Sequence, residues 1–473
     1  MVIKVSSISV FDETKGPFIS KYSPVNGELM FKVPVYGKSE IDWLFNEARK
    51  SLDIFRESSI FQRTEILNSI IENLKHNKND FVDLVAAETG KSRKLSEIEF
   101  DTAIRFGESL VGFARFQDGI SIPSSVNNKE VIFKKIPYGV AGLIVSFNTP
   151  LPNYAWKVFP SFLAGNISIL KPSPHTSASA QLFYECFRKV DTYSNTLFIA
   201  HGDAETGRIL SELDLDLISF TGSYDAGISI QKNTSHLMRK NIFELGGNNA
   251  FIITRNANLE RATDYVLNSA FSNAGQRCAA ASRLLINQDI YPEILGLLTK
   301  KLSEINIGTE DLDLHGPVID EASMLRAEKY ISKCKLNGYV VSQFGVKPEE
   351  KGFFVQPTLV EGFDSDFEFT FEEIFAPVLR VIKFSSNDEA ISIANNTGYN
   401  LTSAVWTSDL TESNYFASKL NSGLININGP THGAEFQFPF GGVRKSGNGS
   451  KEVGFSCIDE YSNHKIITRT YHD

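Results

Sequence analysis

The sequence predicts an α/β protein with two sheets of parallel strands, each covered by helices. Short apolar runs alternate along the chain with stretches that have the apolar spacing of helices, which is typical of doubly wound folds. Most of these runs are apolar at every position, as expected for parallel strands that are buried on both faces. Such sheets bind ligands beyond the carboxyl ends of their strands. Polar residues directly after the strands are therefore the first candidates for a functional site.

The first part of the chain is expected to be helical. Residues 38–118 carry apolar side chains three and four positions apart, and Gly90 is typical of a helix end. Residues 119–137 then change to short β-like segments, which include residues 130–136. A small β unit is therefore expected before the first predicted sheet.

Two groups of strands are predicted after residue 138. The first group is 140–146, 166–170, 196–200 and 215–220, with helices near 154–163 and 177–190. The second group is 250–254, 283–287, 377–383 and 403–406, again with helices between the strands. The tail from Ser456 is short and mixed, and we find no internal repeat or long linker. The pattern indicates two α/β domains.

Composition excludes several classes of protein. The chain has 473 residues, of which 42% are hydrophobic and 22% charged, as in ordinary globular proteins. Its net charge of −9 argues against general nucleic-acid binding, which depends on neutralising phosphates. The first residues are too polar for a signal peptide, and the best apolar run, near 140–145, is far shorter than the roughly 20 residues of a membrane span. We therefore expect no membrane or nucleic-acid partner.

The cysteines indicate the cellular compartment. The four are scattered, without a CxxC pair: Cys186, Cys278, Cys334 and Cys457. This pattern suggests neither a zinc site nor a disulfide framework, so we expect no metal and a reducing, cytoplasmic setting. The chain also has 36 Phe against 4 Met and 3 Trp, which we interpret as a core packed with phenylalanine.

Polar or glycine-rich motifs directly follow three of the predicted strands: FNTP at 147–150, KPS at 171–173 and TGSYDAG at 221–227. Four more motifs come later in the chain: FELGGN at 243–248, NAGQRC at 273–278, FEEIFAP at 371–377 and PFGGVRKSG at 439–447. Each motif alone is ambiguous, because a single Cys is usually a small buried side chain and a Gly-Ser pair is usually a turn.

Taken in this order, the motifs resemble the aldehyde dehydrogenase superfamily along nearly the whole chain. The most specific are FELGGN and GQRC, in which Cys278 lies 34 residues after Glu244. The resemblance implies a Rossmann-like cofactor domain at 1–118 and 138–246 and a catalytic α/β domain at 247–445. It also implies a small β oligomerisation arm at 119–137 and 455–473, and a homodimer or homotetramer.

The resemblance assigns three catalytic residues. Cys278 would attack the aldehyde carbon and form a thiohemiacetal, then a thioester once hydride has passed to a nicotinamide. The side-chain amide of Asn148 and the backbone N–H of Cys278 would stabilise the oxyanion. Glu244 would be the general base that activates water. Relatives that transfer the acyl group to coenzyme A typically lack this glutamate, so we expect the hydrolytic, non-acylating type.

The resemblance also implies a nicotinamide dinucleotide, although no GxGxxG motif is present. Gly222, Ser223 and Gly227, at a helix start, would hold the pyrophosphate. Lys171 would bind the adenosine ribose and Glu373 the nicotinamide ribose. Residues Leu245 and Phe375 complete the expected cofactor set.

The sequence departs from the family at the adenosine ribose. Many relatives have an acidic residue three positions after the lysine, and that residue repels the 2′-phosphate of NADP. Here Pro174 occupies this place, and Lys171 and Ser173 could contact a 2′-phosphate. We expect that NADP is accepted as well as NAD, and leave the preference open.

The substrate is the least specified part. Arg277, beside the nucleophile, could bind an anionic aldehyde or could pair within the protein. By analogy, residues 431–438, with Phe438, lie near the substrate mouth, and Phe113 lies on the helix of the entrance tunnel. A small polar aldehyde is expected, and glyceraldehyde and short semialdehydes are both compatible.

Three other classes of protein fit the motifs less well. A coenzyme A-acylating enzyme of the same fold is disfavoured by Glu244. A cysteine hydrolase would need a Cys-His pair, and no motif places any of four candidate histidines, His175, His201, His236 and His432, in such a pair. A non-catalytic binding protein is disfavoured by the joint presence of Asn148, Glu244 and Cys278.

Overall fold

The computed structural model describes residues 16–116, 119–193, 195–348, 351–362, 371–433 and 435–472. Residues 1–15 of the predicted cofactor domain and residue 434 of the predicted substrate mouth lie outside the described residues. Within the described part, no helix is long and apolar enough to cross a membrane. Nor do these residues bring together three or more His, Cys, Asp or Glu side chains that could hold a metal ion.

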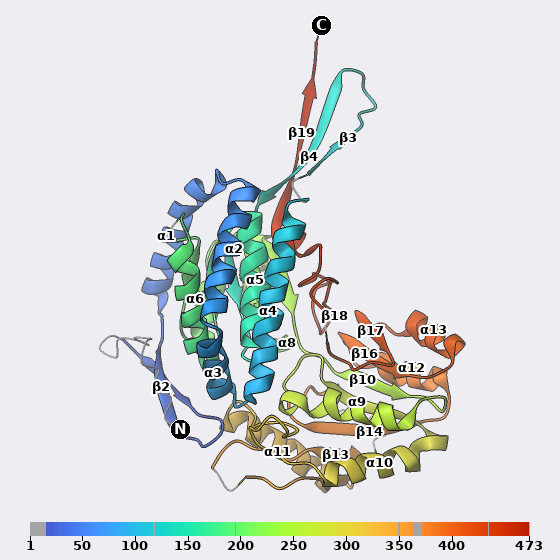
Figure 1. Ribbon diagram of the computed structural model, residues 1–473. Helices are drawn as coiled ribbons and strands as arrows, with labels where there is room; N and C mark the ends of the chain where they lie inside the picture. The colour runs from blue at the N-terminus through green and yellow to red at the C-terminus, as the bar shows by residue number, and fades with distance from the viewer. Residues whose placement is uncertain are drawn as a thin grey trace.

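The predicted helical region forms four helices on one face of the molecule (Figure 1): α1 Lys38–Arg56, α2 Ile60–His76, α3 Lys78–Thr89 and α4 Arg93–Ala114. Local capping explains their limits. Ser59 accepts a hydrogen bond from the Gln62 N–H at the start of α2, and Ser92 accepts one from the Leu95 N–H at the start of α4. Gly90 ends α3 with a φ of 71°, which confirms the predicted helix end.

The first sheet is parallel and has the strand order β7-β6-β5-β8-β9. Its strands are β5 Val140–Ile144, β6 Ile167–Lys171, β7 Leu197–Ile199, β8 Leu217–Thr221 and β9 Lys240–Glu244. The connecting helices are α5 Pro150–Ala164, α6 Ser177–Val190, α7 Ala204–Glu212 and α8 Tyr224–Thr234. Four of the strands confirm the prediction, and β9 was not predicted. The strand order reverses between β5 and β8, where doubly wound sheets bind their ligands.

The second sheet has seven strands in the order β12-β13-β14-β11-β10-β16-β17. They are β10 Asn249–Ile253, β11 Ala281–Asn287, β12 Val340–Gln343, β13 Thr358–Glu361, β14 Val378–Phe384, β16 Thr402–Trp406 and β17 Leu424–Ile427. Helices α9 Leu259–Phe271, α10 Tyr291–Ser303, α11 Glu321–Leu336, α12 Asn387–Asn395 and α13 Leu410–Lys419 belong to the same unit. The four predicted strands are its centre. The edge strand β12 is antiparallel to β13.

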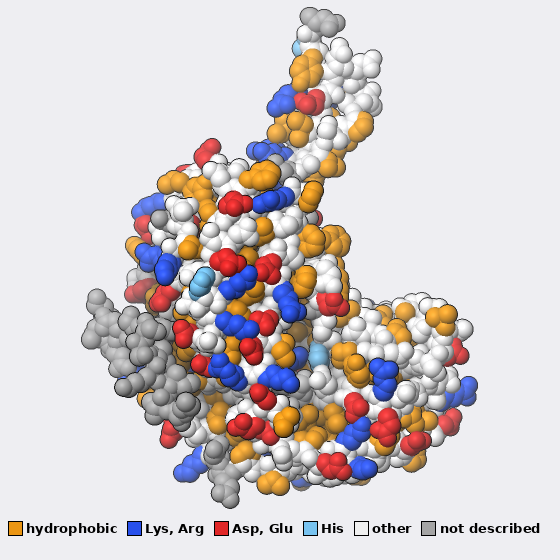
Figure 2. All heavy atoms as spheres, in the orientation of Figure 1, with side chains coloured by type: hydrophobic (Ala, Val, Ile, Leu, Met, Phe, Trp, Pro, Cys, Tyr) orange, Lys and Arg blue, Asp and Glu red, His pale blue; other side chains and the backbone are white. Residues whose placement is uncertain are grey.

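A three-stranded antiparallel sheet projects from the body (Figure 1), and we call it the arm. It contains β3 Gly119–Ile122, β4 Lys129–Pro137 and β19 Ser462–Thr470, in the order β19-β4-β3. Hydrophobic side chains lie along its surface (Figure 2), and Ile120 and Ile466 are 63% and 65% exposed. The remaining small elements are β1 Phe18–Tyr22 with β2 Leu29–Pro34, β15 Tyr399–Asn400 with β18 Val443–Arg444, and α14 Cys457–Glu460.

Phenylalanine fills the core of the first unit. Among the largest fully buried side chains are Phe55, Phe81, Phe106, Phe159, Phe162, Phe183 and Phe187. Their rings contact one another, for example Phe55 with Phe162 at a centroid distance of 5.1 Å. This confirms the interpretation of the phenylalanine excess. The same core includes Val453, Cys457, Ile458 and Tyr461, so the chain returns to the first unit before it enters the arm.

Candidate active site

Asn148, Glu244 and Cys278 line one cavity of about 420 Å³. Asn148 follows β5, and Glu244 is the last residue of β9, so both lie at the carboxyl edge of the first sheet. Cys278 lies just before β11 of the second sheet. The cavity is therefore built from both units, and it is also lined by α4 and α5 through residues such as Leu95, Ile98 and Trp156.

A left-handed turn places Cys278. Asn273, Ala274 and Gly275 have φ values of 56°, 53° and 68°, and a left-handed conformation costs a non-glycine residue on the order of 1–3 kcal/mol. The segment from this turn to Cys278 is closely packed against its neighbours at two glycines. A Cβ at Gly275 would collide with the Ala376 carbonyl, and one at Gly247 would collide with the Cys278 carbonyl oxygen. That carbonyl also accepts a hydrogen bond from Asn249 Nδ2 at 2.7 Å.

The Cys278 thiol is neutral near pH 7 in this arrangement. Burial raises its pKa to about 12, and the Glu244 and Glu373 carboxyl groups add to the effect, which a hydrogen bond from the Ala279 N–H opposes. Attack by sulfur therefore requires that a base remove the proton.

Asn148 is held by three donors. Its backbone carbonyl accepts hydrogen bonds from Lys91 Nζ at 2.5 Å and from Asn273 Nδ2 at 3.2 Å. Its side-chain Oδ1 accepts one from Asn153 Nδ2 at 3.3 Å. The Asn148 Nδ2 group makes no hydrogen bond to a described residue, so it is left to donate into the cavity.

Glu244 is a buried carboxyl without a hydrogen bond from any described residue. Its pKa is raised well above the usual value, chiefly by burial and next by Glu452, and Lys157 and Lys451 oppose the shift. Glu452 lines the same cavity and forms a buried ion pair with Lys157. Lys157 lies on the apolar helix α5 and also donates to Ser219 Oγ at 2.8 Å. Sequence reasoning missed this pair, although a lysine in so apolar a helix was a usable signal.

The predicted adenosine-ribose residues meet at the end of β6. Lys171 is buried, and its Nζ donates to the Pro172 carbonyl at 3.0 Å. Burial lowers the pKa of Lys171 to about 8, against the attraction of Asp203. Pro174 begins a short 3₁₀ turn that Ser173 caps, because Ser173 Oγ accepts a hydrogen bond from the His175 N–H at 3.3 Å.

The predicted pyrophosphate residues meet at the start of α8. Ser223 is the N-cap and accepts a hydrogen bond from the Ala226 N–H, and the Gly222 N–H donates to the Glu244 carbonyl at 3.1 Å. A Cβ at Gly227 would lie 2.8 Å from Leu245 Cδ2, so this glycine lets α8 approach the strand that carries Glu244. Free N–H groups at a helix start favour an anionic ligand.

Glu373 and Phe375 lie beside the same region. Glu373 Oε1 accepts a hydrogen bond from the Gly247 N–H at 2.9 Å, and burial raises the Glu373 pKa to about 7. The Phe375 ring contacts the Phe147 ring edge to face, with centroids 6.0 Å apart. The Lys171 ammonium, the helix start and the Glu373 carboxyl therefore fit the ribose and phosphate groups of a dinucleotide.

Two buried arginines support the Glu373 segment and were not predicted. Arg283 donates to the Asn248 carbonyl, with its Nη2 at 2.7 Å, and Arg380 Nη1 donates to the Glu372 carbonyl at 3.0 Å. Asn248 Nδ2 also donates to the Glu372 carbonyl, at 3.2 Å. The loop after β9 and the loop that carries Glu373 are thereby joined.

The predicted substrate residues separate into two groups. Arg277 lines the cavity beside His432, with Nη1 and Nδ1 3.5 Å apart. Burial lowers the Arg277 pKa, and Glu99 opposes this shift. Phe113 lies about three helical turns beyond the cavity-lining part of α4, and neither Phe113 nor Phe438 is among the residues that line the cavity. The aromatic side chains that do line it are Trp156 and Phe440.

Comparison with known proteins identifies the family. The model of the aldehyde dehydrogenase family matches residues 11–467. The chain is 32% identical to a 2,5-dioxopentanoate dehydrogenase of Saccharolobus solfataricus, over 93% of both chains. It is 30% identical to a D-glyceraldehyde dehydrogenase (NADP(+)) of Picrophilus torridus, over 93% of this chain and 91% of that one. Betaine aldehyde dehydrogenase from Staphylococcus aureus, solved in complex with NAD+, is 29% identical and superimposes with a TM-score of 0.92 over 96% of this chain and 92% of that one. The chain belongs to the aldehyde dehydrogenase family.

Proposed function

We propose that this enzyme oxidises a small aldehyde to its carboxylate with NAD or NADP and water, releasing the reduced cofactor and protons. The observation that carries the proposal is the meeting of Asn148, Glu244 and Cys278 at one cavity. A nucleophile, a carboxyl base and an amide donor are the groups that acyl chemistry requires.

Cys278 Sγ attacks the aldehyde carbon and forms a thiohemiacetal. The thiol proton must leave first, since its pKa is about 12, and Glu244 is the nearby acceptor that lines the same cavity. The negative charge on the former carbonyl oxygen is stabilised by Asn148 Nδ2 and the Cys278 N–H, and loss of one such donor costs about 2.7–4 kcal/mol of barrier. Among the described residues no backbone carbonyl accepts from the Cys278 N–H, so it remains available.

Lys171, Ser223 and Glu373 would hold the dinucleotide. The bound cofactor supplies a hydride acceptor, so that the adduct on Cys278 becomes a thioester. Glu244 passes the thiol proton to solvent before hydrolysis begins. It then takes a proton from water while the resulting hydroxide adds to the thioester carbon, and the departing Cys278 thiolate recovers that proton from Glu244. The raised pKa makes Glu244 a stronger base than an exposed glutamate. A coenzyme A-acylating enzyme is the alternative, and it would show no turnover without coenzyme A.

NADP is accepted as well as NAD, and Pro174 supports this part of the proposal. No carboxylate occupies that position to repel a 2′-phosphate, and the relative from Picrophilus torridus is named for NADP. Introducing the missing charge by Pro174→Glu should lower catalytic efficiency with NADP about tenfold or more relative to NAD. An unmodified enzyme that prefers NAD by about a hundredfold, or roughly 2.7 kcal/mol, would contradict the proposal.

The substrate is a small polar aldehyde, with glyceraldehyde and short semialdehydes as the main candidates. Arg277 at the cavity supports an anionic or hydroxylated substrate, and two relatives are named for 2,5-dioxopentanoate and D-glyceraldehyde. Phe113 and Phe438 remain proposed tunnel residues only. The test is a panel of charged and neutral aldehydes with both cofactors, followed at the absorbance of the reduced nicotinamide. Arg277→Ala should impair charged aldehydes most, and equal losses would remove Arg277 from substrate recognition.

We also propose that the arm joins two or four copies of this chain. Its strands leave sheet edges open and apolar side chains exposed, which a second subunit could cover. All four cysteines are free thiols, which supports a reducing, cytoplasmic setting.

A further inference from the structure

The backbone carbonyl of Asn148 is a meeting point of three distant segments. Lys91, in the turn between α3 and α4, donates to it at 2.5 Å, and Asn273, in the left-handed turn before the nucleophile, donates at 3.2 Å. Both donors are buried. The carbonyl therefore connects the strand end that carries Asn148 with the turn that carries Cys278.

Lys91 is fixed on both sides of this contact. Its ammonium also forms a buried ion pair with Glu99 of α4. The backbone just before it packs closely against the second unit, because a Cβ at Gly316 would collide with the Gly90 carbonyl oxygen and one at Gly90 would collide with Pro317. The turn that carries Lys91 is thus packed directly against the second unit.

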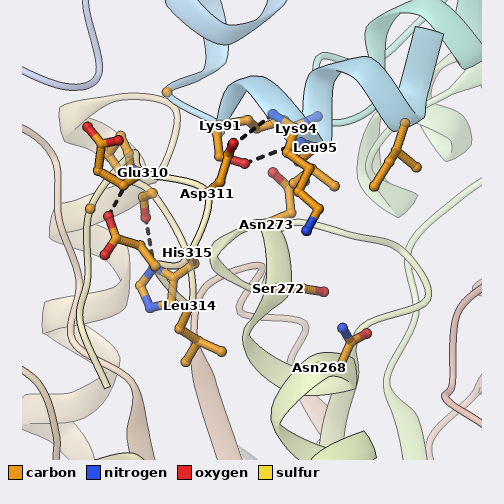
Figure 3. Close-up of a pocket in the computed structure, with 17 residues that line it drawn as sticks. Lys91, Lys94, Leu95, Asn268, Ser272, Asn273, Glu310, Asp311, Leu314 and His315 are labelled. Carbon is orange, nitrogen blue, oxygen red and sulfur yellow. Dashed lines mark hydrogen bonds between the residues drawn. The ribbon is translucent and has the colours of Figure 1, made fainter. Parts of the chain in front are cut away.

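Asn273 is fixed by the nucleophile segment itself. Its Nδ2 also donates to the Gln276 carbonyl at 3.2 Å, and the Gln276 N–H donates back to the Asn273 carbonyl at 3.0 Å. Gln276 Oε1 in turn accepts a hydrogen bond from the Ile319 N–H at 2.9 Å. Figure 3 shows Lys91 and Asn273 among the residues around a neighbouring cavity of about 210 Å³. Pro317 also lines this cavity.

We propose that Lys91 and Asn273 are positioning residues that set Asn148 against Cys278. They act on the main chain of Asn148, while Asn153 engages Oδ1 and thereby turns Nδ2 toward the substrate. The inference rests on the proposed oxyanion role of Asn148. A displacement of about 1 Å in such a donor can cost on the order of a hundredfold in rate.

A double-mutant cycle separates positioning from general stability. Asn273→Ala and Lys91→Met are each made alone and together with Asn148→Ala, and kcat is measured for all five variants and the unmodified enzyme. Lys91→Met is repeated with Glu99→Gln, so that no unpaired carboxylate is left buried if the single variant folds poorly. Lys94→Met is the matched control, because this lysine lies on the same segment with an exposed side chain.

We expect each single variant to lower kcat about tenfold or more, and the same change to cost less than about twofold when Asn148 is already alanine. The control should keep full kcat. If Asn273→Ala and Lys91→Met lower kcat by the same factor whether residue 148 is asparagine or alanine, the positioning role is overturned. A general structural defect would act equally in both cases. If Asn148→Ala itself leaves kcat unchanged, the proposed oxyanion role fails, and this inference fails with it.

Discussion

Two buried lysine–glutamate pairs flank the catalytic cavity, and they act on their catalytic neighbours in different ways. Lys157 pairs with Glu452 on the side of Glu244, and Lys91 pairs with Glu99 on the side of Asn148. Lys157 also donates to a side chain, Ser219 Oγ, whereas Lys91 also donates to a main-chain carbonyl, that of Asn148. The first pair acts through charge on the neighbouring Glu244 carboxyl, which accepts no hydrogen bond from any residue that the structure describes. The second pair acts on Asn148 through a fixed contact. A buried ion pair can therefore shift the pKa of a neighbouring carboxyl group or hold a neighbouring main-chain segment in place. Which of the two it does depends on the group that lies next to the pair.

The largest expected effect gives the reference for both sides of the cavity. Cys278→Ser should lower kcat by roughly ten-thousandfold or more, because an alcohol is a far weaker nucleophile than a thiolate. Both ion pairs act on groups that assist the reaction at this sulfur. Formation of the reduced nicotinamide is measured. Cys186→Ser, a change at a buried thiol of α6 away from the cavity, should keep kcat. Full activity of Cys278→Ser would overturn the mechanism.

The next effect concerns only the side of the cavity that holds Glu244 and the Lys157–Glu452 pair, which we call the charge side. Glu244→Gln should lower steady-state turnover about a hundredfold to ten-thousandfold, because the base for hydrolysis is lost. Rapid mixing should show no burst of one equivalent of reduced cofactor per site, because the variant also lacks the acceptor of the Cys278 thiol proton. A full burst would leave Glu244 with the hydrolysis step alone. Linear product formation at an unchanged rate would show that Glu244 is not the base.

The third effect distinguishes the two pairs directly. Activity that needs ionised Glu244 rises with pH through its pKa. Lys157→Met removes a nearby positive charge, so it should move this rise to higher pH by about one unit or more, while Glu452→Gln should move it to lower pH. Each change should also destabilise the fold by about 3–5 kcal/mol, since it leaves a buried charge unpaired. Lys91→Met should lower kcat without moving the pH profile. A shift of equal size from Lys91→Met would remove the distinction between the pairs.

The smallest effect tests whether a more exposed lysine shifts the Glu244 pKa less than the buried Lys157 does. Lys451 is partly exposed, donates to the Gly441 carbonyl and lowers the Glu244 pKa less than Lys157 does. Lys451→Met should shift the pH profile in the same direction as Lys157→Met but by less, and added salt should weaken the shift. A larger shift than that of Lys157→Met would place the controlling charge at Lys451.

The sequence predicts the parts of this site that local motifs carry. Cys278, Glu244 and Lys171 each stand at the end or start of a strand within a recognisable motif, and the structure places them accordingly. The supporting lysine contacts were not predicted, because they join positions that are far apart in the sequence. Lys157 and Glu452 are 295 residues apart, and Lys91 and Asn148 are 57 apart. Strand β9 is missed because three of the five residues in its sequence, Lys240-Asn-Ile-Phe-Glu244, are polar, so it lacks the continuous apolar run that marks its neighbours.

The projecting arm has a consequence for how stability is measured. Strands β3 and β19 carry exposed apolar side chains, such as Ile120 and Ile466, which are unfavourable in water unless another chain covers them. With a partner bound, mass action adds an association term to the free energy of unfolding, and this term grows with protein concentration. The melting temperature is then a function of dilution, so that variants can be ranked only at equal subunit concentration.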